Sequence, residues 1–244
     1  MFSAFRNAFK VPDLRNKILF TIFVIALYRL GSHIPVPGID FGEVQKLKAQ
    51  ASQGGVYALI NLFSGGALTQ FAIFALGIMP YITASIIVQL LTVVIPRFEA
   101  LKKEGQSGTA KLTQYTRYLT IGLAILQSTG LIALARQPGQ MFQGCDREII
   151  YTDIGIFGIV LMVVVMTAGT GVIMWLGELI TDRGIGNGMS LLIFTSIAAG
   201  FPTSLWQIKI ERGYGLFSMV IAAGLVLVGL VVFVEQAQRR IPVQ

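Results

Sequence analysis

Few side chains in this sequence are suited to covalent or metal chemistry. It has one histidine, His33, beside two prolines, and one cysteine, Cys145, so a zinc site of the usual ligand number would need carboxylates. A lone cysteine forms no intramolecular disulfide, and the motifs of zinc proteases, serine hydrolases and P-loops do not occur. We therefore expect no catalytic residue, no metal and no cofactor, so the function should be non-covalent.

Three alternating glycines, Gly184, Gly186 and Gly188, suggest a phosphate cradle at first sight. No predicted strand precedes them, and their spacing is not Gly-x-Gly-x-x-Gly, so a nucleotide loop is not indicated. Because they lie between two apolar stretches, they predict a tight turn instead. Gly184 is suited to the end of one helix, and Asn187 to the N-cap of the next.

The elements that must position any functional group are long and apolar. Hydrophobic residues make up 54% of the 244 residues and charged residues only 13%, a composition typical of membrane proteins. Uncharged stretches long enough to span a bilayer core of about 30 Å occupy residues 71–95, 118–135, 154–177, 184–208 and 213–234, with a weaker one at 18–34. We expect an all-α polytopic membrane protein with six transmembrane helices.

One uncharged run indicates a segment that enters the membrane only part of the way. Residues 49–96 contain no Asp, Glu, Lys or Arg, and Gly65, Gly66 and Pro80 interrupt them. The run is too long for one span and too short for two spans with a polar loop. Non-helical backbone at membrane depth must be satisfied by protein or by a water-filled cavity, so a re-entrant segment here predicts a pore or a binding cavity.

The basic residues indicate the orientation. With a cytoplasmic N-terminus, 12 of the 19 Lys and Arg residues fall on the inner side, as the positive-inside rule requires. The net charge of +7 then needs no nucleic-acid partner to explain it. Residues 1–17 precede the first span and are either an interfacial amphipathic segment or a frayed basic terminus.

The span at residues 71–95 carries a stripe of mixed character. At 100° per residue, Ile82, Ser85 and Gln89 all lie within about 40° of Ile78 around the helix. Ser and Gln are poorly suited to lipid, and isoleucines four residues apart could form part of an apolar constriction that excludes water and ions. Ordinary helix packing, with Ser and Gln as interhelical hydrogen-bond partners, explains the stripe as well.

Two long segments resemble the signatures of a known family. Residues 71–91, which contain this stripe, and residues 177–188, which contain the glycine turn, resemble signatures of the SecY family, the channel subunits of the protein translocon. Matching segments at 29–38, 61–68 and 102–105 extend the resemblance over essentially the whole chain. It implies a ten-helix channel of two pseudo-symmetric halves. The chain ends at Gln244, so we expect the first half and the sixth span, which would not gate a channel alone.

The resemblance implies roles for individual positions. The pore ring corresponds to Ile78, Ile82, Met189 and Ile193, with Met189 in place of the usual isoleucine. The plug corresponds to about residues 56–69, including Asn61, Leu62, Phe63, Ser64, Gly65 and Gly66. The lateral gate includes Thr83, Ser85 and Gln89. The cytoplasmic surface includes Lys102, Lys103, Arg183, Arg239 and Arg240.

The resemblance also implies an organisation, a location and partners. Residues 1–17 would be a cytoplasmic amphipathic N-terminus, 18–208 the first half, 213–235 the sixth helix and 236–244 the start of a cytoplasmic loop. The protein would translocate secretory polypeptides across the cytoplasmic membrane of a bacterium and insert membrane proteins laterally. Its partners would be SecE, SecG, the SecA motor, the ribosome, signal sequences, nascent polypeptides and membrane lipid, with nucleic acid touched only as ribosomal RNA.

A small-molecule secondary transporter is the alternative hypothesis, since broken helices in transporters also read as a half-span beside a full span. It predicts a substrate-dependent flux and a polar site at mid-membrane. An intramembrane enzyme would need a nucleophile, a metal or a carboxylate pair inside the spans, and the sequence offers none there.

Overall fold

The computed structural model describes residues 11–39, 42, 66–68, 70–136, 150 and 154–236, with the backbone alone at residues 203, 204, 207, 211 and 212. The main helices of this part are α2 (Pro12–Gly31), α5 (Met79–Val94), α6 (Pro96–Lys103), α7 (Gln106–Arg136), α9 (Ile156–Arg183) and α10 (Gly188–Glu235). The chain forms two compact units, Met1–Ala198 and Ala199–Gln244, so the start of α10 belongs to the first unit. The all-helical class expected from the sequence is confirmed.

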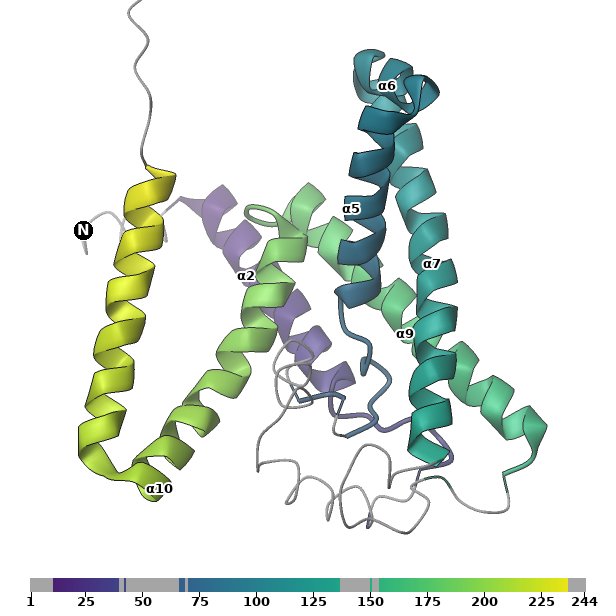
Figure 1. Cartoon of the computed structure of the whole chain (residues 1–244). Helices are drawn as coiled ribbons and strands as arrows, with labels where there is room; N and C mark the ends of the chain where they lie inside the picture. Colours follow the sequence, from purple (N-terminus) through teal and green to yellow (C-terminus); the bar gives the residue numbers. More distant parts are fainter. Residues whose placement is uncertain are drawn as a thin grey trace, which may run out of the picture. The chain divides into compact units, whose positions relative to one another are not determined.

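A proline sets the sharp corner between α5 and α6. Ile95, which precedes Pro96, is held in an extended conformation with φ −104° and ψ 114°, as the residue before proline prefers. The two helices meet there at 100°. Figure 1 shows α5 and α7 side by side with α6 across their common end, where the rings of Phe98 and Tyr115 lie 5.5 Å apart.

The apolar stretch that was expected to be helical from residue 71 begins its helix only at Met79. Residues 70–78 form turns, with positive φ at Phe71 and Gly77. Their backbone is bonded by the segment that follows α2: Val36 N–H donates to the Phe71 carbonyl, and Ile73 N–H to the Ile34 carbonyl, both at 2.9 Å. The expected span was therefore too long at its start, because apolarity alone does not fix backbone conformation.

Most of the expected plug, residues 56–69, lies outside the described residues. This holds for Asn61, Leu62, Phe63, Ser64 and Gly65. Gly66 is described, and it has a φ of +88°, a conformation that favours glycine.

Helix α9 links the two clusters of buried apolar side chains found in the first unit. Met162 and Met166 belong to one cluster, while Ile173 and Ile180 belong to the other. Gly169, between these pairs, lets the non-helical segment approach closely, because a methyl group at Gly169 would overlap the Ile73 carbonyl oxygen. Helix α9 is thus the element against which the broken segment packs.

Length and composition support fewer spans than the six expected. Within the described residues, Gln106–Arg136, Ile156–Arg183 and Gly213–Glu235 are long and apolar enough to cross a membrane, and the bent pair α5 and α6 would make a fourth span. The other two expected spans, at 18–34 and 184–208, are helical over residues 18–31 and 188–208. However, α2 carries Arg15, Lys17 and Arg29, and the apolar helix Gly188–Pro202 is short.

Hydroxyl groups in these helices bond mostly within their own helix. Thr116 donates to the Leu112 carbonyl at 3.0 Å, and Thr120 donates to the Thr116 carbonyl at 2.7 Å. The same bond to a carbonyl three or four residues earlier occurs at Thr21, Thr83, Ser85, Thr92, Ser128, Thr129, Thr170, Thr195 and Ser196. These polar groups are therefore satisfied without help from a neighbouring helix.

Tyr28 makes a bond of a different kind, because it joins two helices. Its hydroxyl oxygen lies 2.6 Å from Ser196 Oγ at the start of α10, and its ring stacks on Phe74 with centroids 5.8 Å apart. Both hydroxyl groups are buried. This bond holds α2 against the start of α10.

Replacing Tyr28 by phenylalanine should lower the free energy of unfolding by about 1 kcal/mol, since the ring packing stays and one buried hydrogen bond is lost. Thermal unfolding of the detergent-solubilised protein measures the change. Tyr118→Phe is the matched control, because Tyr118 is 72% exposed. Equal midpoints for Tyr28→Phe and the control would contradict a stabilising role for the bond.

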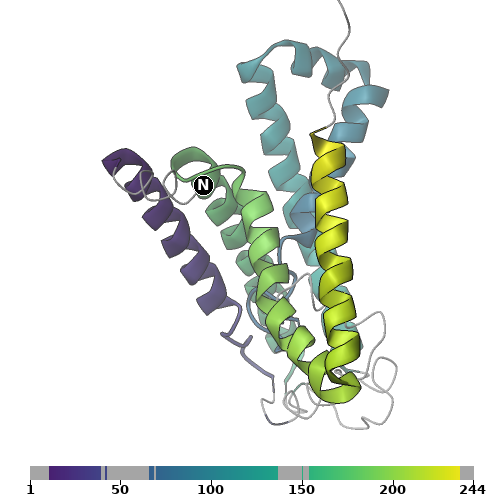
Figure 2. The same cartoon turned by 90° about the vertical axis from the view of Figure 1, so that its left-hand side faces the viewer.

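The second unit is dominated by the remainder of α10, which turns sharply at Gly213 (Figure 2). Gly213 has φ 78° and ψ 179°, which residues with a side chain rarely adopt. Beside the turn, Lys209 Nζ lies 4.3 Å from the Trp206 ring centroid and 4.9 Å from that of Tyr214. These cation–π contacts connect the two arms at the turn.

Candidate functional site

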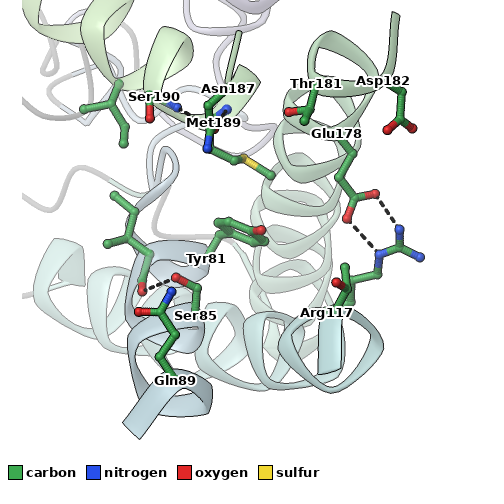
Figure 3. Close-up of a pocket in the computed structure, with 13 residues that line it drawn as sticks. Tyr81, Ser85, Gln89, Arg117, Glu178, Thr181, Asp182, Asn187, Met189 and Ser190 are labelled. Carbon is green, nitrogen blue, oxygen red and sulfur yellow. Dashed lines mark hydrogen bonds and ion pairs between the residues drawn. The ribbon is translucent and has the colours of Figure 1, made fainter. Parts of the chain in front are cut away.

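A pocket of about 550 Å³ lies among four elements of the first unit (Figure 3). Its walls come from α5, α7, α9 and the beginning of α10. The lining residues are Tyr81, Ile82, Ser85, Gln89, Thr113, Arg117, Glu178, Thr181, Asp182, Asn187, Met189, Ser190 and Ile193. The pocket therefore combines a few apolar side chains with a rim of polar and charged ones.

The four side chains expected to form a ring lie in one region of the structure, and they differ in how deeply they are buried. Ile82, Met189 and Ile193 line the pocket. They also pack against a buried apolar cluster that contains Ile78, which is only 4% exposed. Ile78 is buried in that cluster while the other three border the pocket, so apolar residues more than 100 positions apart in the sequence come together here.

Of the three residues expected at the lateral gate, two line the pocket and one does not. Ser85 and Gln89 line the pocket, while the Thr83 hydroxyl donates to the Met79 carbonyl at 3.0 Å and is not part of the lining. The stripe seen in the sequence contained Ser85 and Gln89, whereas Thr83 entered only through the family resemblance.

The basic residues expected on the inner surface lie at exposed helix ends where they are described. Lys103 closes α6 and pairs with Glu99 at 2.7 Å, Lys102 precedes it, and Arg183 ends α9. Arg239 and Arg240 lie outside the described residues.

The glycine turn has the predicted helix cap. Asn187 Oδ1 accepts hydrogen bonds from Met189 N–H at 3.0 Å and from Ser190 N–H at 3.3 Å, which satisfies free donors in the first turn of α10. Thr181 supports the same turn from α9, because its Oγ1 accepts the Gly188 N–H at 2.9 Å. The turn thereby directs Met189 and Ser190 to the pocket.

Gly184 ends α9 as predicted, although for a reason that differs from the expected one. Its φ is −97°, so the left-handed conformation typical of a glycine cap is not used. Instead, a methyl group there would crowd Thr21 Oγ1 of α2. Thr21 Oγ1 also accepts the Ile185 N–H at 3.3 Å, so the turn packs directly on α2.

A second close approach joins α9 to the start of α10. A methyl group at Gly188 would overlap the backbone carbonyl oxygen of Gly177, and a methyl group at Gly177 would overlap the sulfur of Met189. The two backbones can come this near because Gly188 lacks a side chain, while the missing side chain of Gly177 leaves room for the Met189 thioether. This contact fixes the distance between two walls of the pocket.

An ion pair forms another part of the wall, and the sequence reasoning missed it. Arg117 of α7 donates from Nε and Nη2 to the two carboxylate oxygens of Glu178 on α9, both at 2.8 Å (Figure 3). Glu178 directly follows the uncharged stretch 154–177. Its partner was foreseeable, since Arg117 precedes one span and Glu178 ends the next, so opposite charges meet at one membrane face.

This arrangement places apolar side chains beside polar and charged groups that can bind polar partners. Within the described ranges, no three His, Cys, Asp or Glu residues lie close enough together to hold a metal ion. The family model named SecY matches residues 72–244, which is most of the chain and includes every lining residue of the pocket. The chain belongs to the SecY family.

Relatives and solved structures agree with that assignment. The chain is 66% identical over 250 residues to the protein translocase subunit SecY of Streptomyces coelicolor, and 58% identical over 247 residues to that of Mycobacterium tuberculosis. All of the chain is covered, against 57% and 56% of the relatives, so it spans little more than half of their length. These relatives and the apolar helices identify a multi-pass membrane protein.

Two solved structures share the fold. "Sec61 in the Canine ribosome-channel complex from the endoplasmic reticulum" has a TM-score of 0.54 at 18% identity and covers 93% of this chain and 49% of its own. "The structure of a protein conducting channel" has the same TM-score and identity, with 93% and 48% covered. At this identity the likeness concerns the fold alone.

Proposed function

We propose that this SecY-family chain provides the first half and the sixth span of a protein-conducting channel. The channel passes secretory polypeptides across the cytoplasmic membrane of a bacterium and releases membrane spans sideways into lipid. The observation that carries the proposal is that Ile82, Met189 and Ile193 line one pocket and pack against the buried apolar cluster that contains Ile78. Flexible aliphatic side chains can close around a polypeptide yet repel water and ions, without a charged filter.

The parts of the proposed channel follow from the same placement. Ile78, Ile82, Met189 and Ile193 form this half's share of the pore ring, and Ser85 and Gln89 contribute polar contacts on the gate side of α5. Gly66 belongs to the plug, which covers about residues 56–69. Residues 1–17 and 236–244 are cytoplasmic in this proposal, and the first half occupies residues 18–208.

The proposed partners include those that would supply the energy for transport. We propose that the chain is not an enzyme and that the energy for transport comes from a motor or from the translating ribosome. The solved structure of Sec61 in a ribosome–channel complex is compatible with a ribosome partner. The exposed Lys102, Lys103 and Arg183 then face such partners from the inner side, with SecE, SecG and SecA as the bacterial candidates.

A crosslinking experiment tests the proposal. In the assembled translocase, Cys145→Ser removes the native thiol and Ile82→Cys introduces one in the pocket. A secretory chain stalled in transit and carrying one cysteine should form a disulfide with Ile82→Cys only when its signal sequence is intact. Leu126→Cys is the control, because Leu126 is 70% exposed on α7 and is not part of the lining.

The opposite result has a clear meaning. Equal adducts at both positions, or no adduct at Ile82→Cys in a verified complex, would show that the pocket does not lie on the polypeptide path. The small-molecule transporter would then be the better hypothesis.

A further inference from the structure

We infer that Gly177 is a positioning residue: its missing side chain leaves a niche on α9 that receives the Met189 thioether and so limits how far this side chain reaches into the pocket. The inference rests on the proposed function, because it concerns how wide the apolar ring is. It adds a residue outside the ring that determines how far one ring member reaches inward.

The geometry around Gly177 supports a niche for one side chain. A methyl group at Gly177 would overlap Met189 Sδ and lie 2.9 Å from Cε and 3.4 Å from Cγ. All three atoms belong to one flexible side chain, so a substitution can displace the thioether while the backbone stays. Figure 3 shows the Met189 side chain extending from the α10 side toward the helix that carries Glu178, which is α9.

The same contact explains where a displaced thioether must go. On its inner side Met189 packs against the buried cluster that contains Leu176, Ile180 and Leu192, each at most 4% exposed. An interior packed this closely does not admit extra atoms without cost. The remaining space beside Met189 is the pocket, so the thioether moves into it and narrows the access to Ile82.

Methionine suits this niche better than a branched side chain would. Its unbranched thioether has several rotatable bonds and fills irregular gaps, so it can lie along the backbone of Gly177. The family resemblance places isoleucine at this position in most members.

The test measures how fast a thiol in the pocket reacts, with and without a side chain at Gly177. The assembled translocase carries Cys145→Ser and Ile82→Cys and is treated with a membrane-impermeant maleimide from the inner side. We expect Gly177→Ala to slow the labelling of Ile82→Cys several-fold. Gly171→Ala is the matched control on α9, because a methyl group there makes only an ordinary contact, 3.7 Å from Ile121 Cδ1.

A second substitution separates positioning from general damage. In a Met189→Ala background, Gly177→Ala should have no further effect on the labelling rate, because the displaced atoms are gone. Slowing that persists in this background, or an unchanged rate for Gly177→Ala alone, would overturn the inference. Should Ile82→Cys prove unreactive in the parent, Ile193→Cys reports on the same pocket.

The outcome is independent of the crosslinking test above, since no secretory chain is present during labelling. Gly177→Ala could slow the labelling only when Met189 is present, while the stalled chain forms no adduct. In that case Gly177 still positions Met189, and only the proposal that the pocket lies on the polypeptide path is wrong. The adduct could also form while Gly177→Ala has the same effect with and without Met189. In that case the proposed channel function is kept, and the inference about Gly177 is rejected.

Discussion

Replacing Gly188 by valine should prevent the first unit from reaching its folded state. The new side chain would overlap the backbone carbonyl oxygen of Gly177 and crowd the Cβ of Ile180. Neither group can rotate away, because one is main chain and the other lies in a fully buried residue. We expect a loss of at least about 3 kcal/mol, beyond the usual cost of overpacking a core.

The amount of full-length protein in the membrane and its resistance to mild proteolysis measure this loss. Gly122→Val is the control, because no heavy atom lies within 4 Å of a methyl group at Gly122 on α7. Both variants add the same apolar volume to a membrane helix. Similar accumulation and protease resistance of the two would show that α9 and α10 do not meet at Gly177 and Gly188.

Replacing Glu178 by glutamine should destabilise the contact between α7 and α9 by about 1–2 kcal/mol, because Arg117 would keep its charge and lose its carboxylate partner. The side chains of Arg117 and Glu178 are 43% and 21% exposed. The cost should therefore lie between that of breaking a surface pair and that of breaking a buried one. Thermal unfolding in detergent at low salt measures the change.

A charge swap completes the experiment. Arg117→Glu alone should be at least as harmful as Glu178→Gln, since it places two carboxylates together. Arg117→Glu combined with Glu178→Arg should recover part of the stability, although the bidentate geometry depends on side-chain lengths. An absence of recovery would mean that the helices are held by packing and not by the pair. Replacing Lys103 by glutamine should have little effect on stability, because Lys103 pairs with Glu99 on the exposed surface of α6.

The sequence predicted where helices lie better than where they start. Long uncharged stretches predicted α7, α9 and the last arm of α10, because an apolar run of that length is satisfied in lipid only as a helix. The same reasoning failed at residues 71–78. There the chain is equally apolar, but hydrogen bonds from the segment after α2 allow turns in place of helix. Long-range partners of this kind leave no periodic pattern in the sequence.

The candidate site was predicted in part. The stripe on α5 and the cap at Asn187 follow from local spacing, and both are found in the structure. That Ile82 and Met189 share one pocket followed only from the family resemblance, since spacing cannot relate residues on separate helices. The niche at Gly177 was not predicted at all, because a glycine in a helix carries no sign of what approaches it.

The hydroxyl groups that bond within their own helices have a consequence for how such a protein is made. Thr116, Thr120 and Thr170 already donate within their own helices, so these hydroxyl groups need no other partner when a helix first enters lipid; Thr167 of α9, whose buried Oγ1 has no hydrogen-bond partner among the described residues, is the exception. Each span can therefore be released into the bilayer as it is synthesised and wait there for its neighbours. The interhelical bond between Tyr28 and Ser196 and the ion pair between Arg117 and Glu178, by contrast, need both of their helices in place. Membrane insertion and helix packing then become separate events. The loss of one interhelical contact would delay the packing of the helices without preventing their insertion.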